Sequence, residues 1–351
     1  MADNPLAGDL DHVLDHTRDL WDELRGERVF ITGGTGFFGC WLLESLLWAE
    51  DRLGLGVKAV VLTRNPDAFR ARAPHLARHP SLTLQAGDIL SYDFPAGTFS
   101  HFIHAAIDAS AKLNDESPVH MLETIVDGTR HALDHAVACQ AKRFLLTSSG
   151  AVYGKQPSEM THVPEDYAGA PDPLSPRSAY GEGKRLAENL CALYARGAEL
   201  GPKIARCFAF VGPYLQLDVH YAIGNFIRDA LRGGPIVVRG DGTPFRSYLY
   251  AADLAIWLWT ILIRGQSCRA YNVGSEDAIT IEHLAHAVRD VVSPGAEIHI
   301  LQTPDAASPP ERYVPRVERA GRELRLLQRV PLDDAIRRTV HWTLREGGRP
   351  T

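Results

Sequence analysis

The sequence lacks the patterns that hold metal ions or disulfide frameworks. Its cysteines are odd in number, scattered and without metal-ligand spacing: Cys40, Cys139, Cys191, Cys207 and Cys268. No pair among the 15 histidines supports a metal site. We therefore expect no bound metal, and reduced thiols placed in helices and strands.

Long apolar runs and an excess of basic charge are also missing. No run approaches the roughly 20 residues that a bilayer span needs, and the start of the chain, residues 1–5, is acidic and has no apolar signal core. The net charge of -6 gives no electrostatic reason to expect nucleic acid or an anionic membrane as a partner. The composition, 45% hydrophobic and 23% charged, is that of a soluble globular protein, which we expect to be cytoplasmic.

A glycine-rich turn joins a strand pattern to a helix pattern near the start of the chain. Apolar residues 29–31 are followed by Gly33, Gly36 and Gly39, and a helical pattern begins at Cys40. The first glycine permits a tight turn, the second lets the backbone approach a pyrophosphate, and the third lets the helix pack closely on the strand. Because the helix N-terminus offers free N–H groups and a positive dipole end, the stretch predicts a dinucleotide site.

Strand and helix patterns alternate over the first two thirds of the chain. The expected strands cover residues 57–63, 82–86, 101–106 and 143–148, and a long helix covers 119–138. This order predicts an α/β fold with a doubly wound parallel (Rossmann) sheet, in which ligands bind at the carboxyl ends of the strands.

The two ends of the chain have other patterns. Apolar residues recur at helical spacing from Asp9 to Arg25, which predicts an acidic amphipathic helix packed outside the nucleotide domain. From about Pro213 short strands, glycine and proline mix with helices. We expect an N-terminal helical extension (residues 1–26), a mainly dinucleotide-binding domain (27–212) and a smaller, interleaved substrate lobe (213–351).

A tyrosine and a lysine lie four residues apart on a predicted helix. Tyr180 and Lys184 would share one face, and a nearby cation lowers the pKa of a phenol and makes it a usable acid/base. Ser149, at the end of a predicted strand, supplies a hydroxyl for a carbonyl or alkoxide oxygen. Together with a nicotinamide cofactor, these residues would form a hydride-transfer site.

The chain resembles the extended short-chain dehydrogenase/reductases over roughly residues 27–345. The motifs occur in that family's order: Gly33–Gly39, Gly87–Ile89, His104–Ala106, Thr147–Gly154, Tyr180–Lys184, Arg206 with Gly212–Pro213, and Gly240–Asp253. The resemblance covers the branch of nucleotide-sugar epimerases, dehydratases, decarboxylases and 4-ketoreductases, and it does not select one reaction. Members often dimerise through the helices that correspond to residues 119–138 and 180–198.

The resemblance also implies site residues. Asp88 and Ile89 would flank the adenine, and Ala105 and Ala106 would line the cofactor cleft. The whole expected cofactor site is Gly33, Thr35, Gly36, Phe37, Phe38, Gly39, Arg64, Asp88, Ile89, Ala105, Ala106, Thr147, Tyr180 and Lys184. The expected substrate contacts are Ser149, Asn225, Arg246 and Arg312. Both arginines would bind the diphosphate of a sugar nucleotide, whose oxygens a guanidinium can grip in pairs.

The end of the second predicted strand bears on the choice of cofactor. An acidic residue there would bind the ribose 2′-OH of NAD, but the chain reads Thr63-Arg64-Asn65. Thr63 would not repel a 2′-phosphate and Arg64 could pair with it, which favours NADP(H) over NAD(H). Arg64 could equally stack on the adenine or face water.

Four departures from the family pattern concern the reaction. Gly150 and Ala151 stand where 4,6-dehydratases carry an acidic pair and decarboxylases a glutamate, so both routes are disfavoured. Ile125 and Ala209 replace two asparagines of the family. These losses put the usual substrate contacts in doubt, and Ile125 affects how Lys184 is held.

We therefore expect an NAD(P)-dependent enzyme of carbohydrate biosynthesis that transfers hydride at C4 of a nucleotide-linked hexose, as an epimerase or a 4-ketoreductase. Tyr180 would be the acid/base, Lys184 would set its pKa and anchor the nicotinamide ribose, and Ser149 would donate to the developing oxyanion. Three alternatives stay open: a 4,6-dehydratase or decarboxylase with an acid from elsewhere, such as Asp108; a reductase of a non-sugar carbonyl; and a non-catalytic dinucleotide sensor. The nucleotide base and the sugar are not specified.

Overall fold

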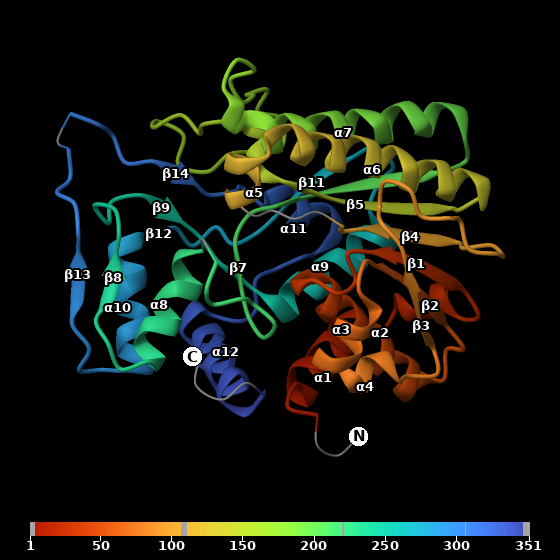
Figure 1. Ribbon diagram of the computed structural model, residues 1–351, viewed down its shortest axis with the longest axis horizontal. Coiled ribbons are helices and arrows are strands. Elements are labelled where there is room, and N and C mark those ends of the chain that lie inside the picture. The colour runs from red at the N-terminus through yellow and green to blue at the C-terminus, as the bar shows by residue number, and fades with distance from the viewer. Residues whose placement is uncertain (1–3, 107–110, 220, 306, 347–351) are drawn as a thin grey trace.

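The computed structural model describes residues 4–106, 111–219, 221–305 and 307–346. Its largest unit is a seven-stranded sheet in the order β11-β6-β5-β4-β1-β2-β3, in which all neighbours are parallel (Figure 1). The strands are β1 (Arg28–Thr32), β2 (Lys58–Thr63), β3 (Leu82–Ala86), β4 (His101–His104), β5 (Arg143–Ser149), β6 (Gly201–Cys207) and β11 (Ala270–Val273).

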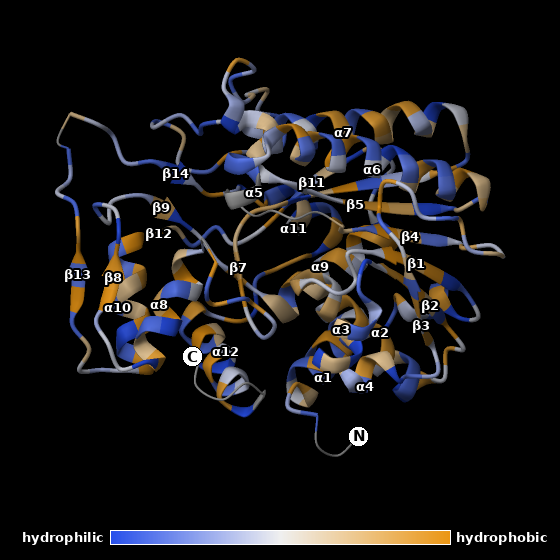
Figure 2. Ribbon diagram, viewed as in Figure 1, coloured by the Kyte–Doolittle hydropathy of each residue, from blue (hydrophilic) through white to orange (hydrophobic). Residues whose placement is uncertain are grey.

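Alternate residues of the strands face two layers of helices. Val29 and Ile31 of β1 belong to one apolar cluster and Phe30 belongs to the other, which is the period-two burial of a strand covered on both faces. The layers are α2 (Phe37–Leu53), α3 (Pro66–Arg72), α4 (Pro74–Ala77) and α9 (Ala251–Arg264) on one face, and α6 (Pro118–Ala138) and α7 (Ala179–Gly197) on the other. In Figure 2 the ribbon of α7 alternates between apolar and polar residues, as expected of a helix between a sheet and solvent. The predicted doubly wound parallel fold is confirmed.

A smaller lobe follows β6 and lies beyond the end of the sheet, on the left of Figure 1. Its strands are β7 (Phe210–Val211), β8 (Ile236–Val238), β9 (Phe245–Arg246), β10 (Leu249–Tyr250), β12 (Ile279–Thr280), β13 (Ile298–Ile300) and β14 (Arg312–Tyr313). Its helices are α8 (Ala222–Leu231), α10 (Ile281–Val292), α11 (Glu318–Leu324) and α12 (Leu332–Glu346). Between these elements, α9 and β11 return to the sheet, so the chain passes repeatedly between the two parts.

The N-terminal segment packs on α2 and α9. The indole rings of Trp21 and Trp259 lie 5.2 Å apart, and Asp9 accepts hydrogen bonds from Tyr250 and Arg338. The expected single helix over 9–25 is wrong at its end, because α1 (Ala7–Thr17) stops and a short 3-10 helix, η1 (Trp21–Leu24), follows. There the Thr17 hydroxyl bonds back to the carbonyl of Val13 and accepts from the Trp21 indole, a pattern that competes with helical bonding.

Two further features concern the helices and the cysteines of the described residues. None of these helices combines the length and the apolar character that a bilayer span requires. All five cysteines are free thiols, and only Cys268 is exposed.

Candidate active site

The glycine turn between β1 and α2 has the close packing that its sequence predicts. Gly33 has a φ of 71°, and a Cβ there would lie 2.3 Å from the carbonyl oxygen of Ala105 at the end of β4. A Cβ at Gly39 would lie 2.3 Å from the carbonyl oxygen of Gly33. Gly36 is the N-cap residue of α2, and no side chain forms a hydrogen bond to this helix end. The N–H groups of the first helical turn are therefore available to bind a ligand. The turn therefore fits a dinucleotide pyrophosphate.

Arg72, on α3, contacts this turn. Arg72 donates from Nη2 to the carbonyl oxygen of Thr35, and the same atom lies 3.6 Å from the sulfur of Cys40. Arg64 is exposed at the end of β2, beside the buried Thr63. The sequence analysis missed Arg72, whose only signal was its place one helix after Arg64.

The expected adenine side of the cleft is built on β3 and β4. Asp88 accepts a hydrogen bond from the backbone N–H of Leu90 (2.9 Å) and so fixes the turn after β3. Ile89 is buried against α6 at Gly128, where an added Cβ would come within 3.0 Å of the isoleucine side chain. Both residues thus hold the end of β3 in place.

The predicted catalytic residues meet at the carboxyl end of β5. The side chain of Ser149 interacts with the Tyr180 hydroxyl, and the Nζ of Lys184 lies 5.8 Å from the centre of the Tyr180 ring. Lys184 is 2% exposed and donates to the carbonyl oxygen of Thr147 over 2.5 Å. Asn114 accepts from the backbone N–H of Tyr180 and so fixes the start of α7. The helix and the strand end therefore bring the three side chains together.

Burial dominates the titration of this group. It raises the pKa of Tyr180, and the hydrogen bond from Ser149 opposes the rise. Burial also lowers the pKa of Lys184 to about 7. The sequence predicted a lowered pKa for Tyr180, and the structure differs because desolvation by burial is the largest influence on this pKa.

The side of α7 next to Lys184 packs against an apolar side chain of α6. Ile125 is fully buried on α6, and its Cδ1 lies 3.1 Å from the place of an added Cβ at Gly183. Nearby, His104 bonds to the hydroxyls of Thr32 (2.8 Å) and Thr129 (3.1 Å). Burial lowers the pKa of His104 to about 3, so this imidazole is neutral.

The expected substrate residues lie in the lobe. Arg246 on β9 pairs in register with Tyr313 on β14, and its Nη2 lies 3.8 Å from a carboxylate oxygen of Glu311. The guanidinium of Arg312 covers the ring of Phe245 at 4.1 Å. Asn225 on α8 accepts from Arg228 over 2.9 Å.

Tyr313 is the residue of β14 that reaches the catalytic group. Its hydroxyl lies 3.4 Å from the Oγ of Ser149. Successive side chains on a strand point to opposite faces, so Arg312 points away from Ser149. The sequence analysis passed over Tyr313, and Asp108, its example of an acid from elsewhere, lies outside the described residues.

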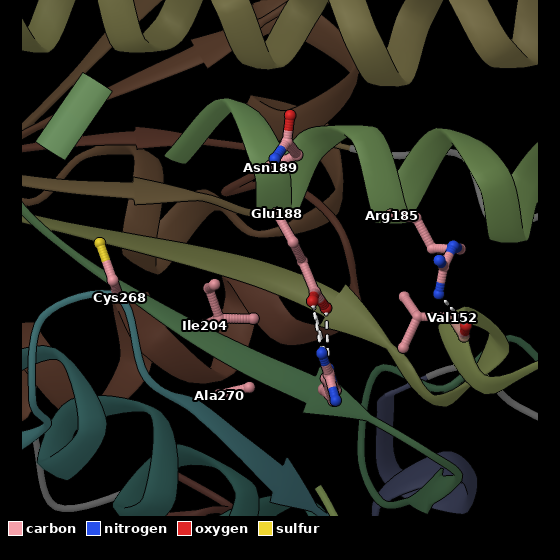
Figure 3. A pocket seen from close by; sticks show the side chains of 8 residues that line it. Val152, Arg185, Glu188, Asn189, Ile204, Cys268 and Ala270 are labelled. Carbon is pink, nitrogen blue, oxygen red and sulfur yellow. Dashed lines mark hydrogen bonds and ion pairs between the residues drawn. The ribbon is translucent and has the colours of Figure 1, made fainter. Parts of the chain in front are cut away.

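A polar pocket beside the end of β5 is lined by Arg206 and Glu188, whose ion pair stabilises this end of the strand (Figure 3). Arg206 on β6 and Glu188 on α7 approach to 2.7 Å in it, and Ser148 donates to the same carboxylate over 2.5 Å. This network fixes Ser148, and with it the neighbouring Ser149. In the part of the chain that the structure describes, no group of three or more His, Cys, Asp or Glu side chains could hold a metal ion.

The family model and the similar sequences that match this chain agree on one family. A model of the NAD dependent epimerase/dehydratase family matches residues 29–274. UDP-glucuronic acid decarboxylase 1 of Arabidopsis thaliana is 32% identical over 313 residues, which cover 89% of this chain and 69% of the relative. UDP-glucuronic acid decarboxylase 2 of the same plant is 33% identical over 84% of this chain and 63% of its own length. The chain thus spans about two thirds of the length of these relatives.

Solved structures of several nucleotide-sugar enzymes share the fold. UDP-glucose 4-epimerase of Thermotoga maritima, solved with UDP-glucose, has a TM-score of 0.77 at 20% identity and covers 91% of this chain and 99% of its own. dTDP-glucose 4,6-dehydratase of Streptomyces venezuelae, solved with NAD, has a TM-score of 0.76 at 24% identity and covers 91% and 97%. UDP-glucuronic acid 4-epimerase of Bacillus cereus, in complex with UDP-glucuronic acid and NAD, has a TM-score of 0.75 at 20% identity and covers 91% and 99%.

Proposed function

Because the chain belongs to the NAD dependent epimerase/dehydratase family, whose members are NAD(P)-dependent enzymes, we propose that it transfers hydride at C4 of a nucleotide-diphosphate hexose. The observation that carries the proposal is the meeting of Ser149, Tyr180 and Lys184 at the carboxyl end of β5, on the same edge of the sheet as the glycine turn after β1. The sugar nucleotides named for the relatives and fold neighbours support the substrate class.

A bound nicotinamide cofactor would supply the hydride chemistry at C4. The glycine turn and the start of α2, including Thr35, Phe37 and Phe38, would hold its pyrophosphate. Asp88 and Ile89 would hold the adenine, and Ala105, Ala106 and Thr147 would line the cleft. Lys184 would hold the nicotinamide ribose. We favour NADP over NAD because the cationic Arg64 follows the uncharged Thr63.

Tyr180 and Ser149 would manage the charge on the C4 oxygen. Tyr180 takes the hydroxyl proton when C4 is oxidised and returns it when C4 is reduced. Ser149 donates a hydrogen bond to the oxygen as its charge develops. The raised pKa of Tyr180 means that its proton-donating form predominates, which suits the reduction of a 4-ketone.

The fate of the 4-keto sugar separates two candidate functions. Gly150 and Ala151 carry no titratable group, which favours hydride exchange at C4 alone, either within one sugar, as in an epimerase, or between a 4-keto sugar and added cofactor, as in a 4-ketoreductase. Relatives that align over most of the chain are UDP-glucuronic acid decarboxylases, which favours decarboxylation of a sugar with a 6-carboxylate. Both candidates share the oxidation or reduction at C4.

A product assay tests the proposal. The purified protein is incubated with NAD(P) and with UDP-, dTDP-, GDP- and CDP-linked hexoses, UDP-glucuronic acid and a 4-keto-6-deoxy sugar nucleotide. Mass spectrometry distinguishes an epimer of unchanged mass, the gain of two hydrogens and the loss of one CO2. Loss of one water from an intact hexose, or no turnover of any of these compounds, would contradict the proposal.

We also propose that the protein is a homodimer. The helices α6 and α7 pack side by side as an outer layer (Figure 1), and Leu186 (47%) and Leu193 (53%), one heptad apart on α7, are exposed. An apolar stripe on an outer helix is a natural contact for a second copy. A cytoplasmic location stays a prediction from the composition.

A further inference from the structure

The hydroxyl of Tyr313 is held in place beside the catalytic serine. It lies 3.4 Å from Ser149 Oγ, and its ring packs against that of Phe208 with the centres 4.7 Å apart. Parallel pairing of β14 with β9 sets Tyr313 opposite Arg246. Backbone pairing and ring packing therefore fix a phenol from the lobe at a site whose other catalytic groups come from the sheet domain.

This hydroxyl occupies the space of a missing side chain. A Cβ added at Gly150 would lie 2.7 Å from the Tyr313 hydroxyl oxygen and 2.7 Å from Phe208 Cε1. Gly150 is where the resembling dehydratases begin their acidic pair, and Ala151 replaces the glutamate of the decarboxylase pattern. The structure thus has no room for a side chain at Gly150, and it places a phenol from another segment there.

We propose that Tyr313 is a second acid of the active site, which protonates C5 of a nucleotide-linked hexuronic acid after the loss of CO2. The inference rests on the proposed oxidation at C4 and selects the decarboxylase candidate. It gives the substrate class as a sugar nucleotide with a carboxylate at C6.

The step balances with one proton. The C4 ketone is β to the C6 carboxylate, so the C5–C6 bond breaks, CO2 leaves, and the electron pair passes into an enolate over C5, C4 and the C4 oxygen. Ser149 and Tyr180 hydrogen-bond that oxygen. The enolate then takes the Tyr313 proton at C5, and the phenolate recovers a proton from water. In sum, one carboxylate and one proton become CO2 and a C–H bond.

The surroundings of Tyr313 suit an acid better than a base. Burial raises its pKa to about 12, while the hydrogen bond with Ser149 and the charge of Arg246 oppose the rise. The phenol therefore keeps its proton at neutral pH. A catalytic base would need the opposite shift.

The test uses Tyr313→Phe, which keeps the ring on Phe208 and removes only the hydroxyl. Enzyme loaded with NAD(P) is mixed with UDP-glucuronic acid in D2O. We expect wild type to form a decarboxylated product with deuterium at C5. In Tyr313→Phe the rate of that product should fall by about 10²-fold or more, while the first burst of reduced nicotinamide stays within about twofold.

Tyr167→Phe is the matched control, because Tyr167 lies in the cluster around Tyr153 and Phe208 without facing Ser149. It should leave rate, burst and deuterium content unchanged. Thermal unfolding of each variant shows whether a loss is structural.

Each outcome decides the inference. Wild-type rates and deuterium content in Tyr313→Phe would overturn it, and so would an equal loss of burst and product. Epimerisation or reduction at C4 of neutral hexoses, without decarboxylation of UDP-glucuronic acid, would overturn the inference. The proposed function would still hold. No turnover of any sugar nucleotide would overturn both.

Discussion

The Nζ of Lys184 lies 2.5 Å from the carbonyl oxygen of Thr147, so the end of β5 itself holds the buried lysine. This backbone carbonyl remains a partner where the asparagine of the family has become Ile125. A carbonyl cannot be titrated or moved by a ligand, so Lys184 keeps its place whichever sugar is bound.

The stability of the cofactor-free protein should depend on pH through Lys184. Its folded pKa of about 7 lies below the 10.5 of a free lysine, so the unfolded chain binds more protons between these values. Stability should therefore rise with pH across that window, by on the order of 1.4 kcal/mol per unit at most, and the penalty is complete below it. Urea unfolding at several pH values should show this rise in wild type and lose it in Lys184→Met. Parallel curves for the two proteins would contradict the assignment.

Removal of the Tyr180 hydroxyl should abolish most of the activity. Tyr180→Phe should lower kcat by about 10²–10⁴-fold, the usual size of a lost acid/base, and leave the cofactor bound. Tyr194→Phe is the control on the same helix, since its hydroxyl bonds to Asp134 on α6 and takes no part in the site. Steady-state assays and cofactor titrations measure both effects. A kcat near wild type in Tyr180→Phe would rule out its role.

Two arginines should affect cofactor binding differently. Arg64→Ala should weaken NADP(H) by about 1.5–3 kcal/mol, the range for a hydrogen bond to a charged group, and hardly change NAD(H). Arg72→Ala should weaken both cofactors, because Arg72 supports the glycine turn at Thr35. Arg70→Ala, which removes only an exposed pair with Asp67, should change neither. A wild type that prefers NAD would refute the proposed selectivity.

Arg246→Lys should reduce the affinity for nucleoside diphosphates. The change keeps the charge and loses the planar fork that grips two phosphate oxygens, so we expect a loss of about tenfold, on the order of 1.4 kcal/mol. Arg312→Lys should matter less, since that guanidinium lies over Phe245. Calorimetric titrations with UDP, dTDP, GDP and CDP measure both. Unchanged affinities in Arg246→Lys would contradict the proposed contact between the guanidinium fork and the diphosphate.

The outer face of α7 should determine the oligomeric state. Leu186→Glu combined with Leu193→Glu would place two carboxylates on the proposed contact, so we expect a monomer in light scattering after size exclusion. Leu327→Glu changes an exposed leucine outside this helix and should leave the mass unchanged. A wild type that is already monomeric would contradict the dimer.

Local patterns in the sequence predicted the sheet and the catalytic helix. The spacing of Gly33, Gly36 and Gly39 is set by contacts within one turn, and Tyr180 and Lys184 are set by one helical repeat. Such features depend on near neighbours and can be read from a single segment.

The residues that the sequence did not reveal depend on distant pairing. Tyr313 reaches a serine 164 residues earlier only because β14 pairs with β9, and neither two-residue strand has a recognisable pattern. The end of α1 depends on the Thr17 and Trp21 side chains, whose bonds no periodicity predicts. The pKa of Tyr180 depends on burial, which the four-residue spacing to Lys184 does not convey.

The hydrogen bonds that Asp9 accepts from Tyr250 and Arg338 also have a consequence for folding during synthesis. Its partner Arg338 is 329 residues further along, and at ~5–20 residues per second the ribosome takes roughly 15 to 65 seconds to supply it. For roughly 3 to 13 seconds of that time β6 also waits for β11, which begins 63 residues after β6 ends, so the growing chain carries an unpaired sheet edge. Because Tyr313 lies on β14, the interleaved topology also delays assembly of the site until that strand has been made.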